Sequence, residues 1–189
     1  VGMSASGQIL TSLFASVTAR TAGFNTVDPA AMTDGSKLLT LILMFIGGNP
    51  GSTAGGVKTT SVIALFLYVR SNIDRSYGIN AFGRRLEEDA VKRAGAICTI
   101  NLTAALAASI LIMAIQPVGM ADVLFETFSA IGTVGMTTGI TRSLLPASRI
   151  VIILLMYCGR IGSMSFALAF TQQKRITHVQ NPVETVSIG

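Results

Sequence analysis

The segment from Ala94 to Ile115 is an uninterrupted apolar stretch long enough to cross a lipid bilayer. A bilayer core needs about 20 consecutive apolar residues in a helix. The composition agrees, because 50% of the residues are hydrophobic and only 12% are charged, well below the share in a soluble domain. With a mean hydropathy of +0.63, the chain is predicted to be an all-α integral membrane protein rather than a soluble, disordered or fibrous one.

Two longer apolar regions contain interruptions. Residues 149–171 form a second predicted span, which carries Arg160 near its middle. The region 38–69 is too long for one ordinary span, and its middle, residues 47–56, is rich in glycine and contains a proline. An uninterrupted helix does not tolerate such a stretch. The region 38–69 is therefore predicted to be a broken helix.

Two shorter apolar segments, residues 4–18 and 120–131, are each followed by a stretch rich in Gly and Thr. Both are shorter than the ~17 residues that a membrane span requires. A helix that enters the membrane and stops is tolerated where protein or a water-filled cavity satisfies its backbone. These segments are therefore interpreted as re-entrant half-helices.

The basic residues are concentrated in loops between the apolar segments. Loop 70–93 carries six of the 14 Lys and Arg residues, and Lys174-Arg175 follow the last span. The positive-inside rule places both regions in the cytoplasm, with residues 27–37 and 139–148 outside. Because the charges are confined to such loops, the net charge of +5 indicates membrane orientation and not a nucleic-acid partner.

The chain also contains an internal repeat at an offset of 112 residues. Residues 36–47 align without gaps on residues 148–159, and most of the pairs are identical or conservative. At the same offset Thr21-Ala22-Gly23 falls on Thr133-Val134-Gly135. A repeat of this length indicates duplicated structural units. The predicted architecture is a channel-like series of span, re-entrant pore loop and span.

The duplicated Thr-x-Gly stretch has the chemistry of a cation filter. Successive backbone carbonyls can replace the hydration shell of an ion, and glycine allows the positive φ angles that such a loop requires. The half-helix before it directs its negative C-terminal end at the cation. A single Thr-Ala-Gly after a helix would be an ordinary tripeptide. Two copies in the same context favour a filter.

With these features the sequence resembles the Ktr/Trk/HKT superfamily of potassium transporters, and most of all the C-terminal portion of the bacterial Ktr-type membrane subunit. The resemblance covers nearly the whole chain. It rests on residues 18–26 (TARTAGFNT), 47–60 (GGNPGSTAGGVKTT), 131–137 (IGTVGMT) and 159–162 (GRIG).

The resemblance implies four span–pore–span units around one pore, of which this chain supplies two. Residues 1–70 would be the third unit without its first span, 94–173 the fourth unit, 71–93 a cytoplasmic linker and 174–189 a cytoplasmic tail. The chain opens at Val1 directly in an apolar helix without a signal peptide. We therefore expect the first two pore units of the same protein to precede it, and two filter segments alone should not conduct.

The resemblance also assigns residues to a filter and a gate. The filter would comprise Thr21, Ala22, Gly23, Phe24 and Asn25 together with Thr133, Val134, Gly135, Met136 and Thr137. An intramembrane gating loop would comprise Gly47, Gly48, Gly51, Ser52, Thr53, Ala54, Gly55 and Gly56, with Lys58 and Arg160 nearby. Each filter copy keeps a single glycine, so discrimination against sodium should rest on few ordered sites.

The implied partners and location follow from the same resemblance. The protein would be a multi-pass plasma (inner) membrane subunit in contact with lipid. It would transport K⁺ bound at the filter carbonyls, with Na⁺ as a candidate coupling ion and no covalently bound cofactor. It would form a homodimer regulated by a cytosolic nucleotide-binding ring.

The Gly-rich stretch 47–56 has two other readings. It could be a simple helix break at a packing contact. It also lies one residue from a phosphate-loop pattern, since Val57 separates Gly56 from Lys58-Thr59. A phosphate loop requires the Lys directly after the last Gly and a preceding soluble strand. An apolar span precedes it here, which argues against a nucleotide site.

Several charged side chains carry further expectations. Arg160, at mid-span, should face the pore or a partner, since a charge at the bilayer centre is costly. It should either pair with carbonyls of the 47–56 loop or set an electrostatic barrier beneath the filter. Lys58 should either line the inner cavity or extend to the cytoplasmic side. Asp122 is interpreted as the N-cap of the second half-helix. Glu126 is expected to brace the filter through hydrogen bonds rather than bind the ion directly.

The sequence contains no grouping of nucleophile, base and acid that predicts an enzyme. The leading hypothesis is therefore a fragment of a potassium-uptake subunit. A membrane scaffold that does not conduct, in which the repeat is only a packing unit, is the alternative from another class. A membrane-bound phosphate-loop ATPase is a second alternative.

Overall fold

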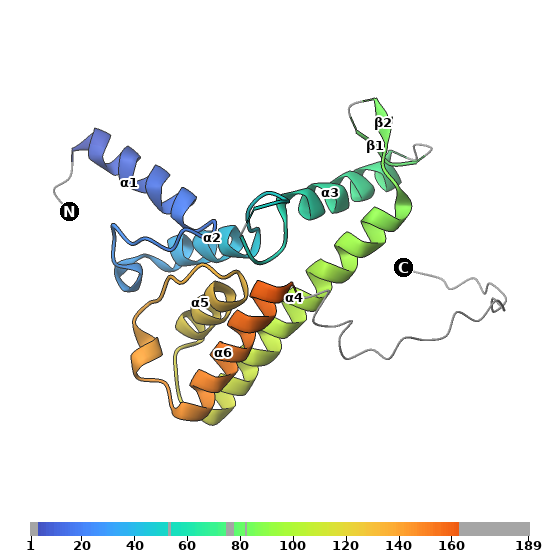
Figure 1. Ribbon diagram of the computed structural model, residues 1–189. Helices are drawn as coiled ribbons and strands as arrows, with labels where there is room; N and C mark the ends of the chain where they lie inside the picture. Colours follow the sequence, from blue (N-terminus) through green and yellow to red (C-terminus); the bar gives the residue numbers. More distant parts are fainter. Residues whose placement is uncertain (1–3, 53, 75–77, 82, 163–189) are drawn as a thin grey trace, which may run out of the picture.

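The computed structural model describes residues 4–52, 54–74, 78–81 and 83–162 (Figure 1). This part of the chain is mostly helical, which confirms the predicted all-α class. The elements in order are α1 (Ala5–Thr18), η1 (Pro29–Ala31), α2 (Asp34–Phe45), α3 (Thr59–Ile73), β1 (Asn80–Ala81), β2 (Arg84–Arg85), α4 (Glu88–Ile115), α5 (Met120–Ile131), η2 (Ile140–Arg142) and α6 (Pro146–Ile161).

The longest helix, α4, contains the predicted span 94–115. Among the described residues it is the one helix that is long and apolar enough to cross a membrane. It begins at Glu88, before the apolar stretch, and the acidic residues in its first turn lie near the positive end of the helix dipole. Helix α6 begins with Pro146, as suits a first helical turn, and follows the second predicted span as far as Ile161. The remainder of that span, with the predicted tail 174–189, lies outside the described residues.

The region 38–69 is a broken helix, as predicted. Helix α2 ends at Phe45 and α3 begins at Thr59, with the Gly-rich loop (residues 46–58) between them (Figure 1). The two ends of this loop are held together, because Gly47 N–H donates to the Val57 carbonyl at 2.8 Å and Val57 N–H donates to the Phe45 carbonyl at 3.3 Å. The end of α2 and the residues just before α3 therefore lie side by side, and the Gly-rich loop closes on itself between them.

The sequence repeat is a structural repeat. In each copy a helix of 12 to 14 residues is followed by a loop, a 3-10 turn and a second apolar helix. Helices α2 and α6 begin at Asp34 and Pro146, which are equivalent positions at the offset of 112 residues. In the second copy α4, α5 and α6 pack against one another, and α2 packs on α5 to join the copies (Figure 1).

The two copies meet through apolar and charged contacts. The rings of Phe45 and Phe128 lie 5.7 Å apart between their centroids. Lys37 in α2 forms an ion pair with Asp122 in α5 at 3.6 Å. The prediction that Asp122 caps α5 is wrong, because the N-cap position is Gly119 and no side chain caps this end. Asp122 forms an ion pair with Lys37 of the other copy instead of a hydrogen bond to the N-terminus of its own helix.

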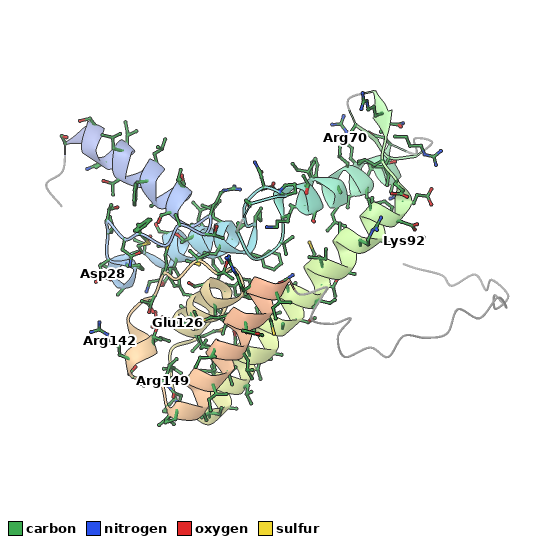
Figure 2. The ribbon with its side chains drawn as sticks, viewed as in Figure 1. Asp28, Arg70, Lys92, Glu126, Arg142 and Arg149 are labelled. Atoms are coloured by element: carbon green, nitrogen blue, oxygen red, sulfur yellow. The ribbon has the colours of Figure 1, made fainter. Side chains whose placement is uncertain are left out.

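The described basic residues of loop 70–93 gather at one end of the molecule, and Arg75 lies outside the described residues. Figure 2 shows Arg70 and Lys92 where α3 and α4 meet the small hairpin, whereas Glu126, Arg142 and Arg149 lie toward the opposite side. Several surface ion pairs connect the charges at the hairpin end, among them Arg70 with Asp74 and Lys92 with Asp89. This separation is the pattern on which the predicted cytoplasmic placement of the loop depends.

The tightest helix contact in the second copy forms at Gly159 of α6. A Cβ atom at this position would lie 2.1 Å from the Ile131 carbonyl oxygen at the end of α5. The backbone of α6 can therefore approach the end of the half-helix only because position 159 has no side chain.

We expect Gly159→Ala to destabilise the protein by about 1–3 kcal/mol, the typical cost of overpacking, because backbone atoms must move to accommodate the methyl group. The measurement is the midpoint temperature of thermal unfolding in detergent. Gly35→Ala is the matched control, since a Cβ there meets nothing within 4 Å. An equal midpoint for the two variants would contradict the packing account.

Candidate ion pathway

Both Thr-x-Gly loops adopt the same unusual backbone conformation. Thr21 and Gly23 have φ angles of 68° and 76°, and Thr133 and Gly135 have φ angles of 53° and 87°. Among the described residues, Thr21 and Thr133 are the only non-glycine positions with positive φ. A β-branched residue rarely adopts this conformation, and such strain is concentrated at functional sites. Both copies of the repeat thus share the same positive φ angles at the Thr and the Gly, which an ordinary connecting loop would not require.

Each loop is anchored to the last carbonyls of its half-helix. In the first Thr-x-Gly loop (residues 19–25), Ala22 N–H and Gly23 N–H both donate to the Thr18 carbonyl, at 3.1 and 3.0 Å. Thr18 also donates through its hydroxyl to the Phe24 carbonyl at 2.7 Å. These bonds satisfy backbone groups that a helix end otherwise leaves without partners.

The second Thr-x-Gly loop (residues 132–138) is anchored in the same way. Thr133 N–H donates to the Ala130 carbonyl at 3.1 Å, and Val134 N–H donates to the Ser129 carbonyl at 2.9 Å. In both copies the negative end of a half-helix therefore faces a loop with duplicated backbone geometry.

The two loops lie directly against each other. A Cβ atom at Gly23 would lie 2.1 Å from the Val134 carbonyl oxygen, whereas a Cβ atom at Gly135 would meet nothing within 4 Å. Gly23 is thus required both by its positive φ and by the close approach of the second loop. Gly135 is required by its φ angle alone.

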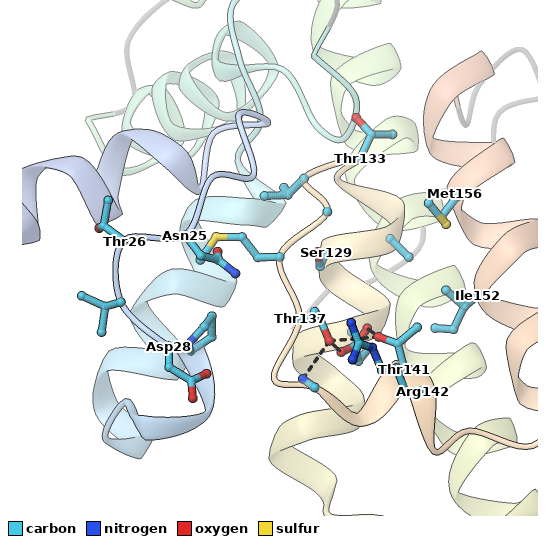
Figure 3. Close-up of a pocket in the computed structure, with 18 of the residues that line it drawn as sticks. Asn25, Thr26, Asp28, Ser129, Thr133, Thr137, Thr141, Arg142, Ile152 and Met156 are labelled. Atoms are coloured by element: carbon cyan, nitrogen blue, oxygen red, sulfur yellow. Dashed lines mark hydrogen bonds between the residues drawn. The ribbon is translucent and has the colours of Figure 1, made fainter.

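A cavity of about 990 Å³ lies beside the second Thr-x-Gly loop. Five predicted filter residues of the second copy line it, from Thr133 to Thr137, and Asn25 lines it from the first copy. Thr21, Ala22, Gly23 and Phe24 are not among its lining residues, and the Phe24 side chain is 71% exposed. Figure 3 shows Asn25 and Asp28 on one side of this cavity and Ile152 and Met156 of α6 on the other.

Glu126 connects the half-helix α5 to the far end of the second loop. Its side chain is buried, and its carboxylate accepts hydrogen bonds from the hydroxyls of Thr137 and, at 2.9 Å, Thr141 (Figure 3). Gly139 N–H donates to the Thr137 hydroxyl at 2.9 Å and extends the network. The expected hydrogen-bonded brace at Glu126 is confirmed. The contribution of Thr141 was missed, because it lies in a 3-10 turn with no motif of its own.

The Gly-rich loop is a folded element with internal bonds. Lys58 donates to the carbonyls of Ala54 and, at 3.5 Å, Ser52. Thr59 donates through its hydroxyl to the Asn49 side-chain oxygen at 2.8 Å. Lys58 was expected to line the inner cavity or extend toward the cytoplasm, and this placement stays a prediction. Thr53 lies outside the described residues.

The glycines of this loop permit close backbone contacts. A Cβ atom at Gly47 would lie 2.2 Å from the Gly55 carbonyl oxygen, and one at Gly48 would lie 2.8 Å from the Ala54 side chain. Gly51 and Gly56 have φ angles of 82° and 69°. The stretch therefore needs several glycines to fold back on itself, which a simple helix break does not require.

The Gly-rich loop also contacts the second Thr-x-Gly loop. Gly55 N–H donates to the Thr133 hydroxyl oxygen at 3.0 Å, although the two residues are far apart in sequence. A Cβ atom at Gly56 would lie 3.3 Å from Gly132 Cα, which places the backbones close together. A phosphate cradle needs backbone N–H groups and a Lys that are available to the anion. Here Gly55 N–H and Lys58 are bonded within the protein.

Arg160 lies in the last turn of α6, two residues before Gly162, the C-cap residue of that helix. Its side chain is exposed and lines the same cavity as the second Thr-x-Gly loop. The equivalent position in the first copy, Gly48, lies within the Gly-rich loop. The expected pairing of Arg160 with carbonyls of that loop stays a prediction.

We expect Glu126→Gln to lower the free energy of unfolding of the protein by about 1–3 kcal/mol, because the second Thr-x-Gly loop is held less firmly. The amide group can accept only at its oxygen, so one of the two threonine hydroxyls loses its acceptor in a buried site. The measurement is thermal unfolding together with proteolysis of residues 136–142. Glu88→Gln on the exposed first turn of α4 is the control, and an equal effect at both positions would contradict the brace.

Comparison with known proteins adds independent information. The family described as TrkH, a cation transport protein, matches residues 1–179. The potassium/sodium uptake protein NtpJ of Enterococcus hirae is 35% identical over 188 residues, which cover 96% of this chain and 42% of that protein. The Ktr system potassium uptake protein B of Bacillus subtilis is 35% identical over 176 residues, which cover 92% of this chain and 40% of that protein.

A solved structure shares the fold. The crystal structure of the potassium transporter TrkH from Vibrio parahaemolyticus matches with a TM-score of 0.73 at 21% identity. The match covers 85% of this chain and 36% of that one. The chain thus spans about two fifths of the length of the relatives it matches.

Proposed function

The chain belongs to the TrkH family of cation transport proteins, and we propose on this basis that it forms part of the pore of a potassium-uptake transporter. Its relatives from Enterococcus hirae and Bacillus subtilis are named for potassium uptake. The proposed substrate is K⁺, which the protein passes across the plasma membrane without a covalently bound cofactor. Transport, and no enzymatic reaction, is the activity proposed.

The observation that carries this proposal is the pair of Thr-x-Gly loops with matching left-handed backbones. Thr21 with Gly23 and Thr133 with Gly135 repeat one geometry, and the loops touch at Gly23 and Val134. Loops of this kind present backbone oxygens to a dehydrated cation. A simple packing unit would not need two strained threonines, so the geometry favours a filter over a scaffold.

Two loops supply only part of a ring of ligands around an ion. We propose that two further pore units of the same protein, outside this chain, complete the filter. The relatives have ample additional length for such units, since this chain spans 42% of NtpJ and 40% of the Bacillus subtilis protein. The cavity lined by Thr133 and Arg160 would then open onto the path shared by all four units.

The Gly-rich loop is proposed to be the gate. It is held beside the second Thr-x-Gly loop by Gly55 and folded by Lys58. Non-helical backbone at membrane depth is tolerated where it is buried in protein or lines a cavity, and beneath a filter it would obstruct the ion. Its ends are fixed at Gly47 and Val57, so that the tip can move while the helices remain in place.

The assembly is proposed from the family and from the names of its members. The Bacillus subtilis relative is described as belonging to a Ktr system, which is the basis for proposing partner subunits. The proposed assembly is a homodimer on a cytosolic nucleotide-binding ring, embedded in lipid, with loop 70–93 and the C-terminal tail in the cytoplasm. NtpJ is named for potassium and sodium, which makes Na⁺ the proposed coupling ion.

Growth of a bacterial strain without potassium-uptake systems tests the function. The transporter that contains this chain should restore growth at low external potassium, and rubidium uptake should rise with its expression. A membrane-inserted protein that gives neither growth nor uptake would favour the scaffold. Potassium-independent hydrolysis of ATP by the purified protein would favour the phosphate-loop alternative.

We expect Gly23→Ala to reduce potassium affinity and selectivity over sodium more than Gly135→Ala does. Both substitutions strain a left-handed position, by about 1–2 kcal/mol. Only the first also drives a Cβ atom into the Val134 carbonyl. The measurement is the concentration dependence of potassium and sodium uptake per assembled protein. Equal effects of the two variants would contradict the assigned geometry.

We expect Lys58→Met to raise basal potassium flux in the absence of regulatory partners. Met retains most of the side-chain volume but cannot donate to the carbonyls of Ala54 and Ser52, and charge-assisted bonds of this kind contribute about 1.5–3 kcal/mol. Flux is normalised to assembled protein. Deleting part of residues 47–56 should act in the same direction.

Arg160→Gln is the companion variant, because the predicted contact of Arg160 with the Gly-rich loop would also hold it closed. A rise in flux for Lys58→Met with none for Arg160→Gln would assign the closing contact to Lys58. Unchanged flux in both variants and in the deletion would remove the gating role of the loop.

A further inference from the structure

We propose that the hydroxyl of Thr133 couples the position of the Gly-rich loop to the presence of an ion in the filter. The inference rests on the proposed function, since it takes the second Thr-x-Gly loop as filter and the Gly-rich loop as gate. It adds a specific positioning residue, which acts through Gly55 and through its own peptide neighbours.

The contact between the two loops is close and directional. Gly55 N–H donates to Thr133 Oγ1 at 3.0 Å, and Gly55 is buried. A Cβ atom at Gly55 would lie 2.4 Å from the same oxygen, so only glycine permits this approach. The Gly-rich loop in its observed position therefore fixes the rotamer of Thr133.

Thr133 is itself part of the strained backbone of the second Thr-x-Gly loop. Its φ angle is 53°, and the next residue, Val134, presents its carbonyl to Gly23 in the other copy. The chain of contacts runs from Gly55 through Thr133 and Val134 to Gly23. A rotation at Thr133 is thus transmitted directly to the place where the two loops meet.

The Thr133 hydroxyl oxygen has two competing uses. Thr133 lines the cavity beside the second loop, where a dehydrated cation takes oxygen ligands. In the structure one of the two lone pairs of Oγ1 accepts from Gly55 N–H, so an ion competes for this oxygen by turning the side chain away from Gly55. An ion that draws this oxygen toward itself weakens the hold on the Gly-rich loop. By thermodynamic reciprocity, release of the loop in turn favours ion binding.

The repeat supplies a matched control at Thr21. Thr21 occupies the equivalent position with a φ angle of 68°, so both threonines are strained in the same way. In the part of the chain that the structure describes, the Thr21 side chain makes no hydrogen bond to the Gly-rich loop. Coupling through a hydroxyl should therefore depend on Thr133 and not on Thr21.

A cysteine in the Gly-rich loop reports the position of this loop. The parent carries Ser52→Cys, because Ser52 is exposed, together with Cys98→Ala and Cys158→Ala and the replacement of any cysteine in the rest of the transporter, so that the new thiol alone reacts. The whole transporter that contains this chain is placed in lipid vesicles. The rate of thiol modification is measured in saturating potassium and in a large organic cation that cannot enter the filter.

Potassium should accelerate modification of the parent by about 2- to 10-fold, the range that one neutral hydrogen bond provides. Thr133→Val, which retains the shape but removes the hydroxyl, should abolish the acceleration. Thr133→Ser should retain it, and so should Thr21→Val. Thr133→Ala carries the same expectation as Thr133→Val and replaces it if that variant does not assemble.

Potassium uptake by the parent, measured in the same vesicles, tests the proposed function separately. In a parent that transports potassium, a modification rate that potassium leaves unchanged or lowers would overturn the coupling. Acceleration that persists in Thr133→Val or Thr133→Ala would overturn it too. Loss of acceleration in Thr21→Val as well as in Thr133→Val would show that any change in the filter suffices and that the hydroxyl contact has no special role.

Discussion

The last carbonyls of a buried helix need hydrogen-bond partners, and the second copy is arranged around this requirement at the end of α5. Helix α5 is buried from Phe125 to Ile131 and packs against α2, α4 and α6. The carbonyls of Ser129 and Ala130 accept hydrogen bonds from the second Thr-x-Gly loop. The Ile131 carbonyl faces Gly159 of α6. The second Thr-x-Gly loop thus supplies hydrogen-bond donors to carbonyls at the end of α5, and α6 packs closely on the same end.

The two copies of the repeat have diverged where their functions are proposed to differ. After equivalent starts, α2 ends at Phe45 and gives way to the Gly-rich loop, whereas α6 continues through Gly159 to Ile161. Glu126, which braces the second Thr-x-Gly loop, corresponds to Phe14 in the first copy. The Gly-rich loop of the first copy contacts the second Thr-x-Gly loop at Thr133. The duplicated units have therefore become complementary parts of one site.

The helices could be predicted from the sequence because apolar length and glycine content are local properties. The breaks on both sides of residues 47–56 and the short helix before each Thr-x-Gly loop were correctly placed for this reason. The roles of charged residues were predicted less well, because their partners come from distant parts of the chain. Asp122 pairs with Lys37 instead of capping its helix.

The left-handed threonines illustrate the same limit. Glycine in the motif signals a positive φ, but a β-branched residue gives no such signal, and only the structure shows Thr21 and Thr133 in this conformation. The different constraints on Gly23 and Gly135 were also hidden from the sequence. They share a motif position, yet only Gly23 is confined by the other copy. Close approach between segments depends on the tertiary fold, so two glycines at the same motif position can have different surroundings.

The bonds that hold the Gly-rich loop set the free energy of moving it. Its ends at Gly47 and Val57 can remain paired while its tip swings, so the bonds to break are those of Gly55, Lys58 and Thr59. A neutral hydrogen bond contributes about 0.5–1.5 kcal/mol and bonds to a charged group about 1.5–3 kcal/mol. The total is a few kcal/mol, which lies in the range that a ligand with different affinities for two states can supply. A gate held by this small set of contacts would stay closed at rest and still respond to an ion above it or a partner below it.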